Sequence, residues 1–165
     1  MPRVVLDVNM LVSARITPAG EAQAILNQAR ISFDLLMSDF VLQKVEQVLG
    51  YPHIQARYSH LSPAVISEYG TTLRALSIPV IEKTVVTASS DPEDNRVMAV
   101  AVDGQADYLV TRNLAHFPST YGQIKIVSPA DFRRLLTEKA PEGPQSSPAP
   151  ESAPDEASDS DPSSN

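Results

Sequence analysis

The chain contains no cysteine among its 165 residues. It therefore has no disulfide framework, no thiolate metal site and no cysteine nucleophile, and it is compatible with a reducing cytoplasm. No apolar run approaches the roughly 18 residues that a membrane-spanning helix needs. The sequence also opens without a basic segment leading into a long apolar stretch, so we expect no secretory signal. These absences predict a soluble, cytoplasmic protein that does not insert into membranes.

An excess of positive charge is also missing, since the formal net charge is −7. Most of that charge lies at the end of the chain, where residues 138–165 hold seven acids and one base. Residues 1–137 carry thirteen acids and twelve bases, a net charge of −1. A nearly neutral body with clustered acids leaves a mildly basic remainder, which permits nucleic-acid binding without demonstrating it.

The chain divides into one folded domain, residues 1–137, and a tail, residues 138–165. The tail is rich in Pro, Ser, Ala and acids, and it holds six of the fourteen prolines. Such a composition buries too little apolar surface to offset the entropy of ordering, so we predict disorder there.

The first strand sets the fold class. In residues 3–9, the run Val4-Val5-Leu6 leads directly into Asp7, which is typical of a strand buried on both faces of a parallel sheet. Further strands are predicted at residues 33–37, 78–81, 106–111 and 125–127, with helical patterns between them. The sequence therefore predicts a three-layer α/β/α sandwich around a mostly parallel central sheet.

Two acids stand out on the predicted helices. Glu46 follows Leu42 by four positions and precedes Leu49 by three, so it lies at or beside an apolar face. Asp94 stands on the inward side of a helix that Asp91 can cap. Taken alone, Glu46 fits a solvated position and Asp7 fits a helix cap.

Asp7 and Asn113 follow predicted strands, and ligands of parallel sheets gather at the carboxyl ends of strands. If Glu46 and Asp94 pack near the same crevice, three carboxylates and an amide converge there. Such a set repels itself unless a hard divalent cation neutralises it, and its oxygen ligands suit Mg²⁺ or Mn²⁺. Hydrolysis of a phosphodiester uses a site of this kind.

Four segments in order resemble the signatures of PIN-domain proteins, and more narrowly the bacterial and archaeal branch described as toxins of toxin–antitoxin pairs. They are Val4-Val5-Leu6-Asp7-Val8-Asn9, Leu42 to Leu49 with Glu46, Asp91-Pro92-Glu93-Asp94-Asn95 and Ala106 to Asn113. The resemblance covers residues 3–136. It implies that Asp7, Glu46 and Asp94 are catalytic, metal-binding acids.

The resemblance further implies that Asn9 supports Asp7 by hydrogen bonding and that Thr111 does similar work at the other strand end. The family's fourth acid falls at Asn113, whose amide brings no charge. We therefore expect weaker metal affinity, or one tightly held ion, unless Asp91 or Glu93 compensates.

The leading hypothesis is a divalent-metal-dependent endoribonuclease that acts as the toxin of a toxin–antitoxin pair. Its expected partners are an RNA substrate, a cognate antitoxin and a second copy of itself in a homodimer. Arg96 and Arg112 flank the acids and are candidates for RNA contacts, although each is equally well explained as a solvated arginine. The alternative is an RNA-binding or protein-interaction PIN module with weakened catalysis. A phosphotransfer receiver domain is disfavoured because no suitable acceptor and lysine pair is found.

Overall fold

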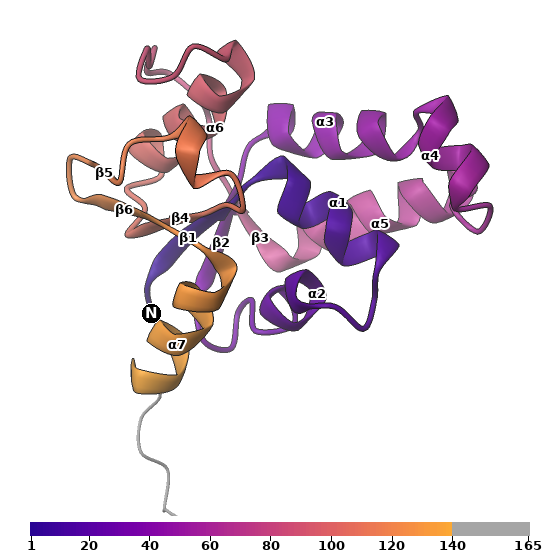
Figure 1. Ribbon diagram of the computed structural model, residues 1–165, viewed down its shortest axis with the longest axis horizontal. Coiled ribbons are helices and arrows are strands. Elements are labelled where there is room, and N and C mark those ends of the chain that lie inside the picture. Colours follow the sequence, from indigo (N-terminus) through magenta and orange to yellow (C-terminus); the bar gives the residue numbers. More distant parts are fainter. Residues whose placement is uncertain (140–165) are drawn as a thin grey trace, which may run out of the picture.

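A mostly parallel sheet forms the centre of the protein (Figure 1). The computed structural model describes residues 1–139, so the predicted tail lies almost entirely outside the described residues. Within the described part the sheet has six strands in the order β3-β2-β1-β4-β6-β5, and β5 is the one strand that runs antiparallel to its neighbour. The strands are β1 (Arg3–Leu6), β2 (Asp34–Met37), β3 (Ser77–Pro79), β4 (Tyr108–Val110), β5 (Thr120–Tyr121) and β6 (Ile124–Val127).

Helices connect these strands and cover the sheet. Over residues 1–139 they are α1 (Val8–Ile16), α2 (Glu21–Leu26), α3 (Asp39–Leu49), α4 (Pro52–Arg57), α5 (Pro63–Leu76), α6 (Pro92–Asp103), the 3-10 helix η1 (Leu114–His116) and α7 (Pro129–Lys139). Helix α7 thus continues two residues past the predicted domain boundary at residue 137.

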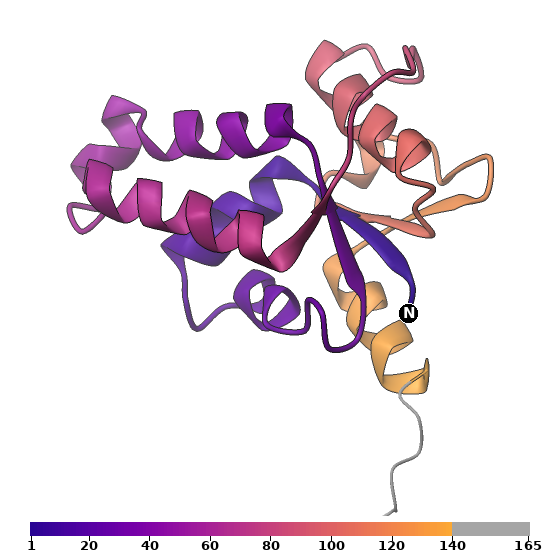
Figure 2. The ribbon, with the colours of Figure 1, turned by 180° about the vertical axis from the view of Figure 1, so that it is seen from behind.

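The layers of the sandwich are visible in both views of the ribbon. Helix α6 packs against β1, β2 and β4, while α7 lies on the other side of the strands (Figures 1 and 2). Phe132 of α7 is fully buried, with ring centroids 5.3 Å from Phe33 and 5.8 Å from Tyr108. Helices α3, α4 and α5 extend together to one side of the sheet. The predicted α/β sandwich with a mostly parallel sheet is confirmed.

The first strand is shorter than its pattern suggested. Val4, Val5 and Leu6 are buried as expected, but β1 ends at Leu6 and α1 begins at Val8. The reason is that Asp7 takes the N-cap position of α1, and a residue that starts a helix cannot continue a strand. Helix α1 therefore starts directly after Asp7.

Local signals at helix ends are used as the sequence indicated. The Ser38 hydroxyl accepts a hydrogen bond from the Val41 backbone at 3.3 Å and so caps α3, which ends at Gly50. Asp91 caps α6 in the same way, by accepting from the Glu93 backbone N–H at 2.9 Å. Strand β3, which ends in Pro79, lies at the sheet edge, where a proline is tolerated. The short edge strand β5 was not predicted.

Candidate active site

Asp7 lies where the two halves of the sheet meet. Leu6 of β1 pairs with Val110 of β4, so the next residues, Asp7 and Thr111, leave adjacent parallel strands side by side. The Thr111 hydroxyl donates a hydrogen bond to Asp7 Oδ2 at 2.8 Å, and Asp7 is only 5% exposed. Burial raises the pKa of Asp7, while the hydrogen bonds from Thr111 and the Val8 backbone act in the opposite direction.

Asp94 approaches the same point from the first turn of α6. Its Oδ2 atom is buried, and among the described residues it has no hydrogen-bond partner. The His116 Nδ1 atom lies 3.7 Å away, beyond hydrogen-bonding distance. Burial raises the pKa of Asp94, and the charges of Asp91 and Asp7 raise it further. Asp7 and Asp94 are thus close enough to repel each other.

We call the region around Asp7, Asp91 and Asp94 the acidic pocket. A cavity of about 460 Å³ opens beside Asp91, Asp94 and His116. Among the described groups, His116 is the nearby one whose charge lowers the pKa of both Asp7 and Asp94. The carboxylates are therefore held together with little positive charge to compensate them, which is the arrangement expected of a cation site.

The predicted supporting residues take different positions. Thr111 is completely buried, and its hydroxyl also accepts a hydrogen bond from the Asn113 backbone N–H at 3.0 Å. Asn113 follows at the start of η1 and is partly exposed. Asn9 is exposed in the first turn of α1, and its side chain makes no hydrogen bond within residues 1–139. Of the two predicted supports of Asp7, Thr111 thus bonds to it, whereas Asn9 makes no such bond within residues 1–139.

Glu46 does not join Asp7 and Asp94. Its carboxylate lies against Gly70 of α5, so close that a Cβ on Gly70 would lie 2.0 Å from Glu46 Oε1. Over residues 1–139, no three His, Asp or Glu side chains are grouped so as to hold a metal ion. The expectation that three carboxylates meet in one pocket is corrected in this respect. The apolar spacing did put Glu46 on a packing side of α3, but that side faces α5 rather than α6.

Helix α3 presents a lysine to the first turn of α6. Lys44 Nζ lies 2.6 Å from Glu93 Oε1, in the first turn of α6 beside Asp94. The Lys44 side chain is 17% exposed, and its hydrogen bond with Glu93 raises its pKa. Sequence reasoning missed this residue because it searched α3 for acids. The spacing along α3 could have pointed to it, because Lys44 follows the buried Val41 by three positions and therefore lies beside the buried face.

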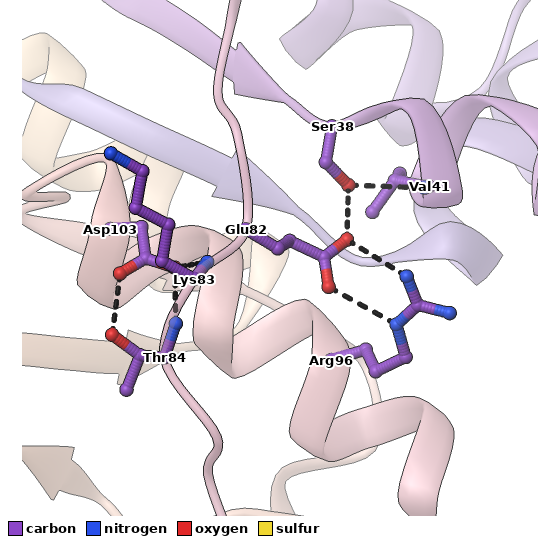
Figure 3. A network of polar contacts seen from close by, with 7 residues as sticks. All are labelled: Ser38, Val41, Glu82, Lys83, Thr84, Arg96 and Asp103. Atoms are coloured by element: carbon purple, nitrogen blue, oxygen red, sulfur yellow. Dashed lines mark hydrogen bonds and ion pairs between the residues drawn. The ribbon is translucent and has the colours of Figure 1, made fainter.

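The two candidate arginines already have partners. Arg96 Nε lies 3.1 Å from Glu82 Oε2, and its guanidinium covers the Phe40 ring at 3.7 Å from the centroid. Figure 3 shows Glu82 between Arg96 and the Ser38 hydroxyl. Arg112 donates to the Ser13 hydroxyl at 2.9 Å and is exposed. Arg112 is thus the more available of the two for a phosphate.

Comparison with known proteins identifies the family. The family model described as "PIN domain" matches residues 3–115. The chain belongs to the PIN-domain family. PIN domains are generally nucleases, and they typically use divalent metal ions.

The fold is also similar to that of a solved structure described as VapBC2 from Rickettsia felis bound to a DNA fragment from their promoter. The TM-score is 0.55 at 12% sequence identity, over 76% of this chain and 98% of that one. A search among curated proteins gives no match. Within residues 1–139, no helix of this PIN domain is long and apolar enough to cross a membrane.

The residues of this PIN domain fit one divalent ion held by two carboxylates. This conclusion rests on two oxygen ligands. They are the buried Oδ2 of Asp94, which has no hydrogen-bond partner among the described residues, and the neighbouring Asp7 carboxylate. Mg²⁺ is commonly bound through one or two carboxylates, several waters and the phosphates of a substrate, and does not need a cage built from protein alone. Two acids therefore suffice for a weak site that the phosphates of a substrate would complete.

Proposed function

We propose that this PIN domain is an endoribonuclease that hydrolyses RNA phosphodiester bonds with one Mg²⁺ or Mn²⁺ ion. The observation that carries the proposal is the buried Asp94 oxygen that has no hydrogen-bond partner within residues 1–139, beside the buried carboxylate of Asp7. Leaving a buried carboxylate oxygen without a hydrogen bond costs stability, and such a cost is expected at a site that a ligand completes. When bound, the ion supplies polarisation of the phosphate and an activated water.

Residues in and beside the acidic pocket have defined parts in this proposal. Asp7 and Asp94 hold the ion, and the Thr111 hydroxyl fixes the Asp7 carboxylate from the neighbouring strand. Asn113 offers an uncharged oxygen where a fourth acid was expected, so the ion is held by less negative charge. Arg112 lies exposed two residues beyond the end of β4 and is the proposed contact for a flanking phosphate.

We also propose that the nuclease is the toxin of a toxin–antitoxin pair. The support is the resemblance of its motifs to that branch together with a shared fold with VapBC2. A cognate antitoxin and a homodimer are the partners that this role implies.

The decisive experiment combines metal, chelator and substitutions. The full chain is incubated with end-labelled single-stranded and hairpin RNA in Mn²⁺, then with EDTA. We expect cleavage that EDTA, Asp7→Asn and Asp94→Asn each reduce by at least about 100-fold, as loss of a metal ligand requires. Asp39→Asn is the matched control, because Asp39 is an acid in the first turn of a different helix, well exposed and paired with Arg74. Cleavage that survives Asp7→Asn and Asp94→Asn contradicts the proposal.

Glu46→Gln belongs to the same series. If Glu46 acts from its place against Gly70, the substitution leaves cleavage within about twofold of the wild type, as for residues that touch neither ion nor substrate. A loss as large as that of Asp94→Asn would mean that Glu46 turns into the acidic pocket when metal and RNA bind. It would restore Glu46 as a third metal-binding acid.

A second function is favoured by the positions of Glu46 and Asn113, which leave the pocket with two acids. It is an RNA-binding or protein-interaction PIN module with little turnover. That function predicts RNA binding in EDTA that Arg112→Ala weakens, with no cleavage in Mn²⁺. Gel-shift and cleavage assays on the same RNA separate the two functions.

A further inference from the structure

Lys44 links helix α3 to the first turn of α6. Its ammonium nitrogen lies 2.6 Å from the Glu93 carboxylate. The Lys44 side chain is largely buried, at 17% exposure, whereas that of Glu93 is 53% exposed. An ion pair with one partly buried member holds its geometry better than two fully exposed side chains do. Glu93 is therefore directed toward α3.

Glu93 belongs to the electrostatic environment of the acidic pocket although it does not point into it. It stands next to Asp94 in the first turn of α6, two residues after the N-cap Asp91. A third carboxylate is thus within electrostatic range of the two acids that are proposed to hold the ion. It is paired with a cation instead.

We propose that Lys44 is a positioning residue that holds the Glu93 carboxylate on α3 and thereby lowers the affinity of the acidic pocket for a divalent ion. This inference rests on the proposed function, namely that Asp7 and Asp94 hold such an ion.

Two effects of Lys44 act in the same direction. The positive charge of Lys44 repels a metal ion. Its ion pair also neutralises the Glu93 carboxylate, which would otherwise attract such an ion. Removing the ammonium reverses both effects at once and releases the exposed Glu93 side chain as a third oxygen donor. The metal should then bind with less dependence on RNA phosphates.

The test measures metal binding directly. Mn²⁺ is titrated into the full chain without RNA, and free Mn²⁺ is followed by electron paramagnetic resonance. In Lys44→Met, which keeps the apolar stem and removes the charge, we expect the Kd for Mn²⁺ to fall about tenfold, the effect of one carboxylate ligand gained. Lys44→Arg keeps the charge and the ion pair, so its Kd should match that of the wild type.

Two further variants tie the effect to Glu93. Adding Glu93→Gln to Lys44→Met should cancel most of the gain, because the released donor is then uncharged. Arg74→Gln is the matched control for charge. Arg74 also pairs with an acid of α3, with its Nη1 3.3 Å from Asp39 Oδ1, and that pair is well exposed. This variant should leave the Kd for Mn²⁺ unchanged.

The possible outcomes distinguish failure of this inference from failure of the proposed function. If the wild type binds Mn²⁺ through Asp94, as shown by a loss in Asp94→Asn, and Lys44→Met binds no more tightly, the inference is overturned and the proposed function stands. If neither the wild type nor Lys44→Met binds Mn²⁺ at millimolar concentration, the proposed ion site fails and the inference fails with it. Tighter binding that persists in the double variant also overturns the role given to Glu93.

Discussion

At the scale of single residues, the carboxylates of this protein fall into two kinds with opposite consequences for stability. The pKa values of Asp7 and Asp94 are raised, chiefly by burial of their carboxylates, and the charge of Asp91 raises both further. The pKa of Asp103 is lowered, chiefly by a backbone hydrogen bond from Lys83 and then by the Thr84 hydroxyl. The ionised form is thus opposed by the fold at the acidic pocket and favoured by it at the end of α6.

Asp94→Asn should therefore stabilise the metal-free protein by about 1 kcal/mol, the usual size of gain when a strained functional residue is neutralised. A raised pKa means that the folded state binds the proton more tightly than the unfolded chain does. The cost of the charge is absent well below the unfolded pKa of 3.8, grows as pH rises toward the folded pKa, and is complete above it. Urea unfolding at pH 7, with EDTA present, measures the gain in stability. The same measurement at lower pH tests whether the gain disappears.

Asp7→Asn provides a check on that interpretation. The Thr111 hydroxyl still finds an amide oxygen to donate to, so the same sign is expected. Equal loss of stability in both variants at pH 7 would show that the carboxylates hold the metal-free fold together, contrary to the expectation.

Gly70→Ala is a second test at residue scale. The new Cβ would collide with Glu46 Oε1, which is the free end of a flexible side chain. Ala is better than Gly within a helix by roughly 1 kcal/mol. Because the carboxylate can swing aside, we expect thermal unfolding to show unchanged or slightly raised stability. A loss above about 2 kcal/mol would mean that Glu46 is fixed in place, as an overpacked core group would be.

At the scale of elements, the loop between β3 and α6 is held at two points that Figure 3 shows together. The Glu82 carboxylate bonds to the Ser38 hydroxyl and to Arg96. Asp103 Oδ2 accepts from the backbone N–H groups of Lys83 and Thr84, at 2.5 and 2.9 Å. This loop leads to Ser89 and Asp91, so its anchoring fixes the approach to the acidic pocket.

Asp103→Ala should destabilise the fold by about 1.5–3 kcal/mol, the range for hydrogen bonds to a charged group. Because the pKa of Asp103 is lowered, its contribution is complete above the unfolded value of 3.8 and is lost as pH falls through the folded value. The difference in unfolding free energy from the wild type should thus be constant near neutral pH and shrink in acid. A difference that does not shrink as pH falls through the folded pKa would point to a packing defect instead of a lost anion.

The elements also show how far the sequence could be interpreted in advance. Apolar runs and caps located β1, α3 and α6 because these signals are local. Local signals could not show which side of α3 faces α6. Lys44 and Glu46 are two positions apart and so lie about 200° apart around the helix. Which of them meets α6 depends on the placement of α5, and periodicity alone does not give that.

At the scale of the whole molecule, the order of strands explains why Asp7 and Thr111 are neighbours despite their separation in sequence. The chain builds β1, β2 and β3 toward one edge and then returns to add β4 on the other side of β1. The acidic pocket lies at this reversal, where the crevice of an open parallel sheet forms. The strand-end residues could be predicted from this rule once a parallel sheet was expected. The position of His116 beside Asp94 could not, because it depends on the conformation of the loop after β4.

Metal binding should consequently stabilise the entire domain. An ion that neutralises Asp7 and Asp94 binds only the folded chain, so it adds about 2.7 kcal/mol when free Mn²⁺ is 100 times its Kd. The melting temperature in Mn²⁺ should rise by several degrees over that in EDTA, and Asp94→Asn should melt at the same temperature in both. Asp103→Ala serves as the comparison, since its lower melting temperature should still rise with Mn²⁺. A rise of equal size in Asp94→Asn would show that Mn²⁺ binds elsewhere on the protein and that the acidic pocket is not the metal site.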